Sequence, residues 1–243
     1  MKKILFFLIL IFTISIPAYA KEKLPILLYH NITVSEPTAD LDLHISKSNF
    51  IKHLEYLKNS GYTTITFKDY YSHRVYGTSL PEKPIIITFD DGYKSNYEIA
   101  YPLLKEYGFC ATIFTVTNSS YQPFSTIYPH FNWEEANEMQ KSGIIDIESH
   151  SANHSLHDFL SASDIIYNTK KSYYDICVNL RKVPFTYAYP SGKFSLLSQF
   201  LVADMGYKIQ VIVGGKINDS STPLNMLSRL NISGNTNLKE LLN

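Results

Sequence analysis

The chain has 243 residues, of which 45% are hydrophobic and 18% are charged, so it has the composition of a folded protein with a sizeable core. The same figures exclude a disordered or fibrous chain. Its 22 Lys and Arg residues balance its 22 Asp and Glu residues. Because domains that bind nucleic acids usually carry a basic excess, this balance gives no reason to expect a nucleic-acid partner.

The first residues have the pattern of a signal peptide. Lys2 and Lys3 precede an apolar run at 4–16, and small residues suited to cleavage follow at 18–20 (AYA). The run is shorter than the ~20 residues that a membrane-spanning helix needs. We therefore expect a signal peptide over residues 1–20 and an exported protein that is secreted, periplasmic or associated with the cell wall. An uncleaved anchor or a core helix is the alternative.

The remaining chain, residues 21–243, contains no repeat, linker or low-complexity tract and is expected to form one domain. Apolar strand-like runs occur at 24–29, 63–67, 84–89, 111–116, 143–148, 185–189 and 208–213. Helices are expected between them, over 48–59, 93–107, 133–141, 163–180 and 194–205. Alternating helices and wholly apolar strands predict a parallel α/β sheet. Seven strands favour a barrel or near-barrel, with an open doubly wound sheet as the alternative.

Polar or turn-forming residues follow four of these strands. His30 ends the first, Asp90 and Asp91 follow the third, His150 follows the fifth and Ser191 the sixth. In parallel α/β folds, ligands and catalytic residues gather at the carboxyl ends of the strands. The sequence therefore predicts a site at this end of the sheet.

The two adjacent acids can have separate tasks. If the chain turns at Gly92, Asp90 and Asp91 point in different directions, so that one can bind a metal while the other acts as a base. Capping of the following helix is the alternative explanation for the pair.

His150 and His154 are spaced so that both imidazoles can lie on one face of a helix or in one tight loop. Two histidines and a carboxylate are typical ligands of zinc or another divalent transition metal. A polar surface turn is the alternative. His157 is expected in solvent, because three ligands are already available, with a neighbouring or spare ligand as the alternative.

Four segments together carry a family resemblance. They are LPILLYHNI (24–32), PIIITFDDGYKSNYEIAYPLLKEYGFCATIFTV (84–116), NWEEANEMQKSGIIDIESHSANHSL (132–156) and FTYAYPSGKF (185–194). The chain resembles the polysaccharide deacetylases of carbohydrate esterase family 4, the NodB-homology domain, over about residues 24–232. TFDDG followed by H-x-x-x-H is a specific signature. Tyr29-His30 makes the chain most similar to the exported poly-β-1,6-N-acetylglucosamine deacetylases.

The resemblance implies a distorted (β/α) barrel of about seven parallel strands in a single domain. It also implies a metal-dependent hydrolase that removes N-acetyl groups from N-acetylglucosamine residues of an extracellular or cell-wall polysaccharide and releases acetate. The expected cofactor is a divalent transition metal, zinc first, with iron, cobalt and nickel as alternatives. The expected partner is a polysaccharide bearing N-acetylhexosamine, and no obligate protein partner is indicated.

The family's roles can be transferred to matching positions. Asp90 matches the catalytic base, and the metal ligands match Asp91, His150 and His154. The YAYPSG segment matches a wall of the substrate groove, in which a backbone N–H helps to hold the oxyanion. This assigns substrate binding to Tyr189, Pro190 and Ser191. Where the family commonly has an aromatic residue, this chain has Ser191, so that the wall is expected to be less apolar.

The late part of the chain departs from the family pattern. Most members supply the general acid from a late Leu-x-His motif, but here residues 226–232 read MLSRLNI and contain Arg229 but no histidine. His30 matches an early histidine that takes this role in the poly-N-acetylglucosamine branch, and we predict it to be the acid; a structural residue at the barrel rim is the alternative. Arg229 is expected either to orient Asp90 or to bind substrate, with an ordinary surface ion pair as the alternative.

Other residues receive no role in the predicted site. The remaining histidines are expected in solvent, the aromatic residues at 121–133 are assigned no site, with Trp133 packing at the start of a helix, and Cys110 and Cys177 are expected to be unbridged. These histidines are His44, His53, His73 and His130, and the other aromatic residues are Tyr121, Phe124, Tyr128 and Phe131.

Two other function classes stay open at this point. An esterase that removes O-acetyl groups from a polysaccharide would use the same metal site. A catalytically inactive carbohydrate-binding module would lack one of Asp90, Asp91, His150 or His154, and all of these are present.

Overall fold

The computed structural model describes residues 22–120 and 128–242, so the predicted signal peptide and Tyr121 and Phe124 lie outside the described residues. The strands are β1 (Ile26–Tyr29), β2 (Asn31–Thr33), β3 (His44–Ser46), β4 (Thr63–Thr64), β5 (Pro84–Asp91), β6 (Ala111–Thr115), β7 (Ile145–Ser149), β8 (Thr186–Ala188), β9 (Ile209–Val213) and β10 (Leu227–Asn231). The helices are α1 (Lys47–Asn59), α2 (Phe67–Tyr76), the π-helix η1 (Asn96–Ala100), α3 (Tyr101–Tyr107), α4 (Trp133–Lys141), α5 (Ala162–Leu180), the 3-10 helix η2 (Pro190–Gly192), α6 (Leu196–Asp204) and α7 (Leu238–Leu241).

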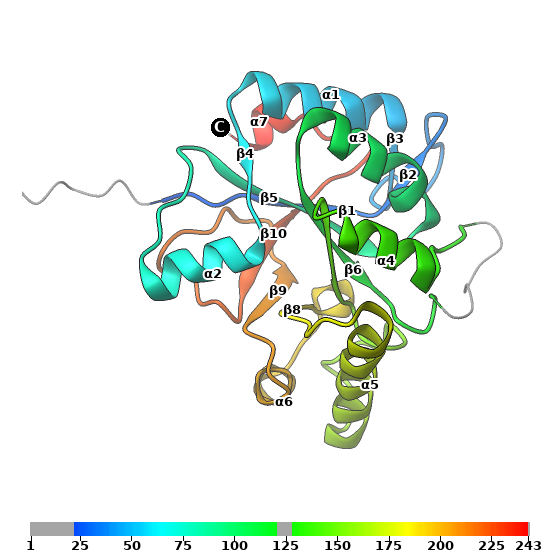
Figure 1. Cartoon of the computed structure of the whole chain (residues 1–243), viewed down its shortest axis with the longest axis vertical. Helices are drawn as coiled ribbons and strands as arrows, with labels where there is room; N and C mark the ends of the chain where they lie inside the picture. Colours follow the sequence, from blue (N-terminus) through cyan, green and yellow to red (C-terminus); the bar gives the residue numbers. More distant parts are fainter. Residues whose placement is uncertain (1–21, 121–127, 243) are drawn as a thin grey trace, which may run out of the picture.

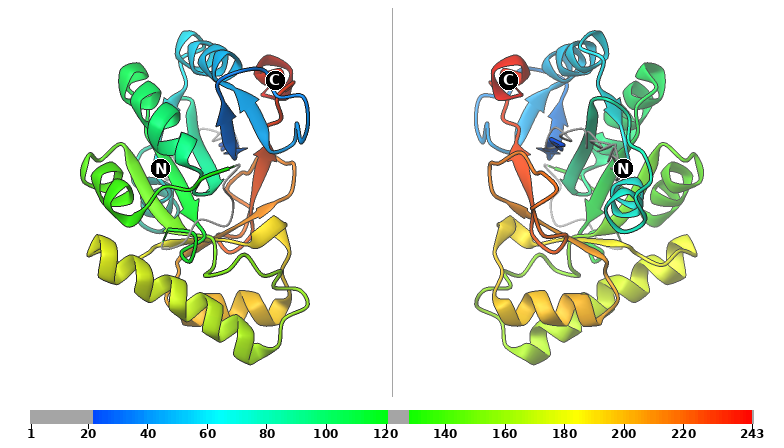
Figure 2. Two further views of the ribbon diagram at one scale, coloured as in Figure 1. Left: turned by 90° about the vertical axis from the view of Figure 1, so that its right-hand side faces the viewer. Right: turned by 90° about the vertical axis from the view of Figure 1, so that its left-hand side faces the viewer.

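Seven parallel strands close into a barrel. The ring runs β1, β5, β6, β7, β8, β9 and β10, and it closes because β1 pairs with both β5 and β10. The helices lie around the outside of these strands (Figures 1 and 2). The predicted barrel is therefore confirmed, and closure excludes the open doubly wound sheet.

The strands of the ring differ from the predicted seven in one member. The segment expected as a strand at 63–67 forms only the two-residue β4, which pairs with the first residues of β5 outside the ring. Its place is taken by β10, which was not predicted. Arg229 and other polar residues interrupt the apolar pattern of β10, although four of its five residues are buried.

The barrel is distorted between β7 and β8. These strands share one residue pair, Ser149 with Tyr187, whereas β6 and β7 pair along five residues. At the gap, one carboxylate oxygen of Glu148 accepts the backbone N–H groups of Phe185 at 2.7 Å and Thr186 at 2.9 Å. The other oxygen accepts from the ammonium of Lys182 at 2.8 Å. A buried side chain thus replaces backbone bonds that the strands do not make.

Alternation along the strands divides the core. Residues of one parity, such as Leu27 and Ile87, pack against Leu54 of α1 and the other outer helices. Residues of the opposite parity, such as Ile86 and Leu227, pack in a second cluster. Side chains two residues apart on a strand face the same side. Thr88 and Asp90 of β5 therefore share the inner face of the barrel with Ile86, and Arg229 of β10 shares it with Leu227.

The helices mostly match the expected ranges. The α4 range is as predicted, and its first turn is closed by a capping box in which Asn132 and Glu135 bond to each other's backbone N–H. The expected helix over 93–107 is divided into η1 and α3, and α2 and α7 were not predicted. Cys110 and Cys177 are free thiols. Within residues 22–120 and 128–242, no helix combines the length and apolar character needed to cross a membrane.

Candidate active site

Four strand ends meet at one cavity of about 540 Å³ at the carboxyl end of the barrel. The residues that line it include His30 after β1, Asp90 and Asp91 at the end of β5, His150 after β7 and Ser191 after β8. The structure therefore brings together the polar residues that the sequence placed at separate strand ends.

The two adjacent acids point in different directions. Asp91 has a φ of 71° and Gly92 a φ of 81°, both in the left-handed region. A Cβ on residue 92 would lie 2.7 Å from Oγ1 of Thr115, so that only glycine fits at this turn. Positive φ values at non-glycine residues are uncommon and often mark functional sites. The turn sends the carboxylate of Asp90 into the barrel and that of Asp91 towards the histidines.

Asp90 is held by a buried arginine. Its carboxylate accepts two hydrogen bonds from the guanidinium of Arg229, at 2.6 and 2.7 Å, and Arg229 is fully buried. Burial by itself raises the pKa of Asp90, but the positive charge of Arg229, followed by His150, more than offsets it, so that the pKa lies well below its usual range. Asp90 is thus a carboxylate at neutral pH.

Asp91, His150 and His154 form a group that can hold a metal ion. One oxygen of Asp91 lies 3.6 Å from Nε2 of His150 and 3.4 Å from Nε2 of His154, and the three ligand atoms lie within 4.8 Å of one another. Ligands about 2.0–2.1 Å from a tetrahedral zinc ion stand about 3.4 Å apart. The donor set and its spacing therefore fit a divalent transition metal.

The tautomer of His150 also suits a metal ligand. Its Nδ1 lies 2.9 Å from the carbonyl oxygen of Ala188, which can only accept, so Nδ1 carries the proton and Nε2 presents its lone pair to Asp91 and His154. Burial lowers the pKa of His150 to about 4, although the nearby carboxylates of Asp90 and Asp91 act in the opposite direction. The ring is neutral at pH 7, as metal coordination requires.

His30 lies on the wall of the cavity. It is the first residue after β1, and its Nδ1 is buried with no hydrogen-bond partner among the described residues. A buried polar atom without a hydrogen-bond partner is unusual and calls for an explanation. The place of His30 on the cavity wall agrees with the predicted proton donor.

The residues of the YAYPSG segment occupy different environments. Ser191 lines the cavity and has a φ of 53° within the turn η2. The side chain of Tyr189 is fully buried, and its hydroxyl donates to the side-chain oxygen of Gln210 at 2.7 Å. Pro190 is also buried and does not line the cavity. A direct substrate contact by Tyr189 or Pro190 is therefore not supported, and their place is behind the wall that carries Ser191.

Arg229 requires a similar correction. It is fully buried and is not among the residues that line the cavity, so neither a surface ion pair nor a direct substrate contact describes it. Of the predicted roles, only the orientation of Asp90 agrees with its position.

Three histidines expected in solvent are buried. His157 hydrogen-bonds through Nε2 to the hydroxyl of Tyr187 at 2.8 Å, and its ring packs against Tyr189. His44 and His53 are also buried, and each has a hydrogen-bond partner. Hydrophilic side chains are placed in solvent by default from sequence, whereas burial with a paired nitrogen depends on contacts between distant segments.

The remaining two histidines are partly buried. Nε2 of His73 lies 2.6 Å from the carboxylate of Glu22. His130 lines the cavity and stacks on Tyr93, with ring centroids 5.1 Å apart. Tyr128 lines the same wall, so that Tyr93, Tyr128 and His130 form an aromatic side of the cavity that sequence reasoning did not assign. Trp133 is buried at the start of α4, as expected.

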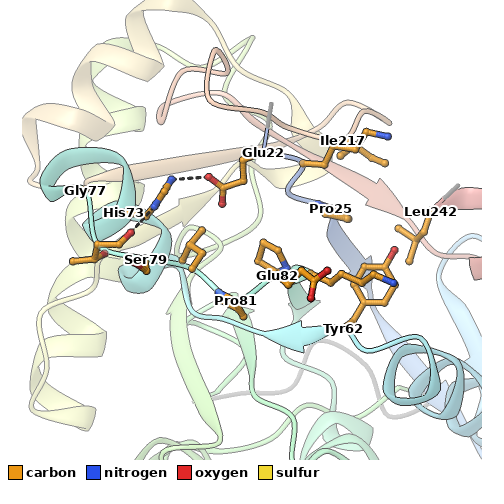
Figure 3. A pocket seen from close by; sticks show the side chains of 15 residues that line it. Glu22, Pro25, Tyr62, His73, Gly77, Ser79, Pro81, Glu82, Ile217 and Leu242 are labelled. Atoms are coloured by element: carbon orange, nitrogen blue, oxygen red, sulfur yellow. Dashed lines mark hydrogen bonds and ion pairs between the residues drawn. The ribbon is translucent and has the colours of Figure 1, made fainter. Parts of the chain in front are cut away.

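A larger cavity, about 680 Å³, lies away from these residues (Figure 3). Its lining includes Pro25, which precedes β1, and Pro84, which begins β5. Tyr62 and Glu82 also line it. Figure 3 shows the ion pair between Glu22 and His73 at its edge. It contains none of the candidate metal ligands, so size does not identify the candidate active site in this protein.

Comparisons with known proteins agree with the fold. The family model described as Polysaccharide deacetylase matches residues 77–210. The chain is 39% identical to YxkH of Bacillus subtilis (strain 168) over 132 residues, which cover 54% of this chain and 43% of that protein. It is 30% identical to the poly-beta-1,6-N-acetyl-D-glucosamine N-deacetylase of Staphylococcus aureus (strain MSSA476) over 158 residues, which cover 61% of this chain and 53% of that protein.

These matches thus span about half the length of the curated relatives. Among solved structures, the Streptococcus pyogenes deacetylase PplD, solved in complex with acetate, superimposes with a TM-score of 0.84 at 27% identity. That match covers 92% of this chain and 98% of PplD. The family model covers more than half of the chain and includes the DDG turn, His150 and His154. The chain therefore belongs to the polysaccharide deacetylase family.

Proposed function

We propose that the protein is a metal-dependent hydrolase that removes N-acetyl groups from N-acetylglucosamine residues of an extracellular or cell-wall polysaccharide, with release of acetate. The observation that carries this proposal is the position of the ionised Asp90 beside the ligand group Asp91, His150 and His154 in one open cavity. The name of the Staphylococcus aureus relative supports a glucosamine polymer as the substrate class.

The residues of the site divide the reaction between them. A divalent metal, zinc in the first instance, would be held by Asp91, His150 and His154 and would supply Lewis-acid polarisation of the acetyl carbonyl and of water. Asp90, kept ionised by Arg229, accepts the proton of the attacking water. Oδ2 of Asp90 lies 3.5 Å from Nε2 of His150, so that the base stands directly beside the ligand group.

His30 completes the proton transfers. As water adds to the carbonyl carbon, a backbone N–H in the turn at Ser191 donates to the developing oxyanion. The C–N bond then breaks, and His30 gives its proton to the leaving nitrogen, which is too basic to depart as an anion. The products are acetate and a free amine on the sugar.

The predicted processing and location belong to the same proposal. Residues 1–20 would act as a signal peptide, and residues 21–243 would form the deacetylase domain. A polysaccharide outside the cytoplasm is the substrate that such an exported enzyme would meet, in the periplasm, in the cell wall or in the medium.

Acetate release tests the proposed function. The purified protein, loaded with zinc, is incubated with β-1,6-linked, chitin and peptidoglycan oligomers and, separately, with O-acetylated xylan oligomers. Acetate from an N-acetylated oligomer, abolished in Asp90→Asn, supports the proposal. Acetate from the O-acetylated oligomers alone would replace it with an O-acetyl esterase, and no acetate from any oligomer would leave an inactive carbohydrate-binding module.

A further inference from the structure

We propose that Ser95 and Asn96 are positioning residues for the proton donor. These two residues follow the turn of Asp90 and Asp91 and hold the chain at His30, so that the imidazole stands at the leaving nitrogen. The inference rests on the proposed function, in which His30 is the general acid.

Three hydrogen bonds fasten the segment that begins at His30. The side-chain amide of Asn96 donates to the carbonyl oxygen of His30 at 2.9 Å. The hydroxyl of Ser95 donates to Oδ1 of Asn31 at 2.7 Å and accepts the backbone N–H of Ile32 at 3.0 Å. Three successive residues beyond β1 are thus each bound by the segment that follows the catalytic turn.

The conformation of Asn96 has features that stability alone does not favour. Asn96 is fully buried, its side-chain Oδ1 has no hydrogen-bond partner among the described residues, and it begins the π-helix η1. An unpaired buried acceptor is destabilising, and π-turns are rare and frequent at functional sites. Both are explained if the residue is placed to reach the backbone of His30.

The network continues to the aromatic side of the cavity. Because Oδ1 of Asn31 accepts from Ser95, its Nδ2 faces Nδ1 of His44 at 3.2 Å. The buried ring of His44 packs against Tyr128, with centroids 4.7 Å apart, and Tyr128 lines the cavity. The segment 30–32 is therefore held from two sides. His44, which packs against Tyr128 of the cavity wall, contacts it on one side, and the residues after the catalytic turn bind it on the other.

Loss of these bonds should affect proton donation more than the other steps. A displacement of about 1 Å can lower the rate of a correctly aligned reaction by about 10². None of the three bonds involves Asp91, His150 or His154, so metal binding should be unchanged. A defect specific to the leaving group then distinguishes positioning of His30 from a general loss of structure.

The test uses Asn96→Ala and Ser95→Ala with Asn168→Ala as the matched control. Asn168 of α5 is likewise buried, its side-chain nitrogen donates to the carbonyl of Asp164 at 3.0 Å, and its Oδ1 is also without a partner among the described residues. It lies outside the bonds described above. The variants are assayed on the N-acetylated oligomer and on 4-nitrophenyl acetate, whose leaving group needs no proton, and again in a His30→Ala background.

We expect Asn96→Ala to lower kcat on the amide by about 10–100-fold and on the ester by less than about threefold. In the His30→Ala background it should cause no further loss, because the group that it positions is gone. Zinc affinity should equal that of the wild type. Equal losses on both substrates, losses that multiply with that of His30→Ala, or weakened zinc binding would overturn the proposal.

Hydrogen exchange provides a readout that does not depend on turnover. Ser95→Ala should speed exchange in the peptide 29–33, which contains the N–H of Ile32, whereas Asn168→Ala should not. Unchanged exchange would contradict the proposal that Ser95 holds the segment beginning at His30. A wild-type protein inactive on every oligomer would overturn the proposed function. If exchange were nevertheless faster in Ser95→Ala, Ser95 and Asn96 would have only a structural role.

Discussion

Arg229 and Asp90 form a bidentate ion pair on the inner face of the barrel. The two N···O distances are 2.6 and 2.7 Å, and both residues are almost completely buried. The guanidinium also lies over the ring of Phe114, 5.3 Å from its centroid. Removing one partner would leave the other charge buried and unpaired. The pair therefore affects both the stability of the barrel and the protonation state of the proposed base, Asp90.

Replacing the arginine should damage both properties. Arg229→Met is expected to lower the free energy of unfolding by about 3–5 kcal/mol. Without the guanidinium, the pKa of Asp90 rises, so that the acidic limb of the pH–rate profile for kcat/KM should move to higher pH. Chemical unfolding and a pH series of acetate release measure the two effects.

A double variant separates charge from packing. Arg229→Met combined with Asp90→Asn removes both charges and should recover part of the lost stability, but no turnover. If Arg229→Met instead raises KM and leaves kcat and the pH profile unchanged, the arginine contacts substrate and its assigned role is wrong.

Removal of the metal should abolish activity. A strong chelator is expected to eliminate acetate release, and zinc should restore it, because Asp91, His150 and His154 supply a metal-ligand set. Asp91→Asn should weaken zinc binding by at least about tenfold, since an amide is a poorer ligand than a carboxylate. Isothermal titration with zinc and metal analysis provide the measurement.

The adjacent Asp90→Asn is the control for this prediction. It should keep zinc and lose turnover, because Asp90 bonds to Arg229 and is not one of the three candidate ligands. Full activity in chelator-treated protein would contradict the metal site. Loss of zinc in Asp90→Asn with zinc retained in Asp91→Asn would show that the two acids have exchanged roles.

Much of the candidate site could be predicted from sequence because its residues follow strands. His30, Asp90, Asp91, His150 and Ser191 all come at the carboxyl end of an apolar run, and the parallel barrel brings these ends together. The period of the apolar residues determines this arrangement, and periodicity is local information.

Other features depend on contacts that no local pattern contains. The strand β10 was missed because Arg229 reads as exposed unless its partner on β5 is known. His157 was placed in solvent because three metal ligands were already available, and its buried contact with Tyr187 of β8 could not be read from the sequence. Tyr189, Pro190 and Ser191 were all assigned to the substrate groove, whereas of these three only Ser191 lines the cavity. In each case a long-range pairing overrides the average preference of the residue type.

The proposed general acid gives a prediction about the leaving group. His30→Ala should retain zinc and fold but lose about 10²–10⁴ in kcat on the N-acetylated oligomer. The loss should be much smaller on 4-nitrophenyl acetate, whose phenolate departs without a proton. An equal loss on both substrates would indicate a structural role, and near-normal turnover of the amide would assign the acid to another group.

The buried His53 predicts how stability varies with pH. Nε2 of His53 donates to the carbonyl of Thr236 at 3.0 Å, and Nδ1 accepts from the hydroxyl of Tyr29 at 3.0 Å, so the neutral ring is satisfied on both sides. Burial lowers the pKa of His53 below its ordinary 6.5. As the pH falls through 6.5, the unfolded chain therefore binds a proton at this residue before the folded protein does, and the free energy of unfolding decreases.

Comparison with His53→Gln isolates this effect. Glutamine can keep the donor to Thr236 but does not titrate, so the stability lost between pH 7.5 and 5, values chosen on either side of the ordinary histidine pKa of about 6.5, should be larger in the wild type than in the variant. The other buried histidines, His44, His150 and His157, are present in both proteins, and their contributions cancel in the difference. Urea unfolding of the two zinc-free proteins at several pH values measures it. Parallel stability curves would show that His53 has the same pKa in the folded and unfolded chains, and burial would then not control its titration.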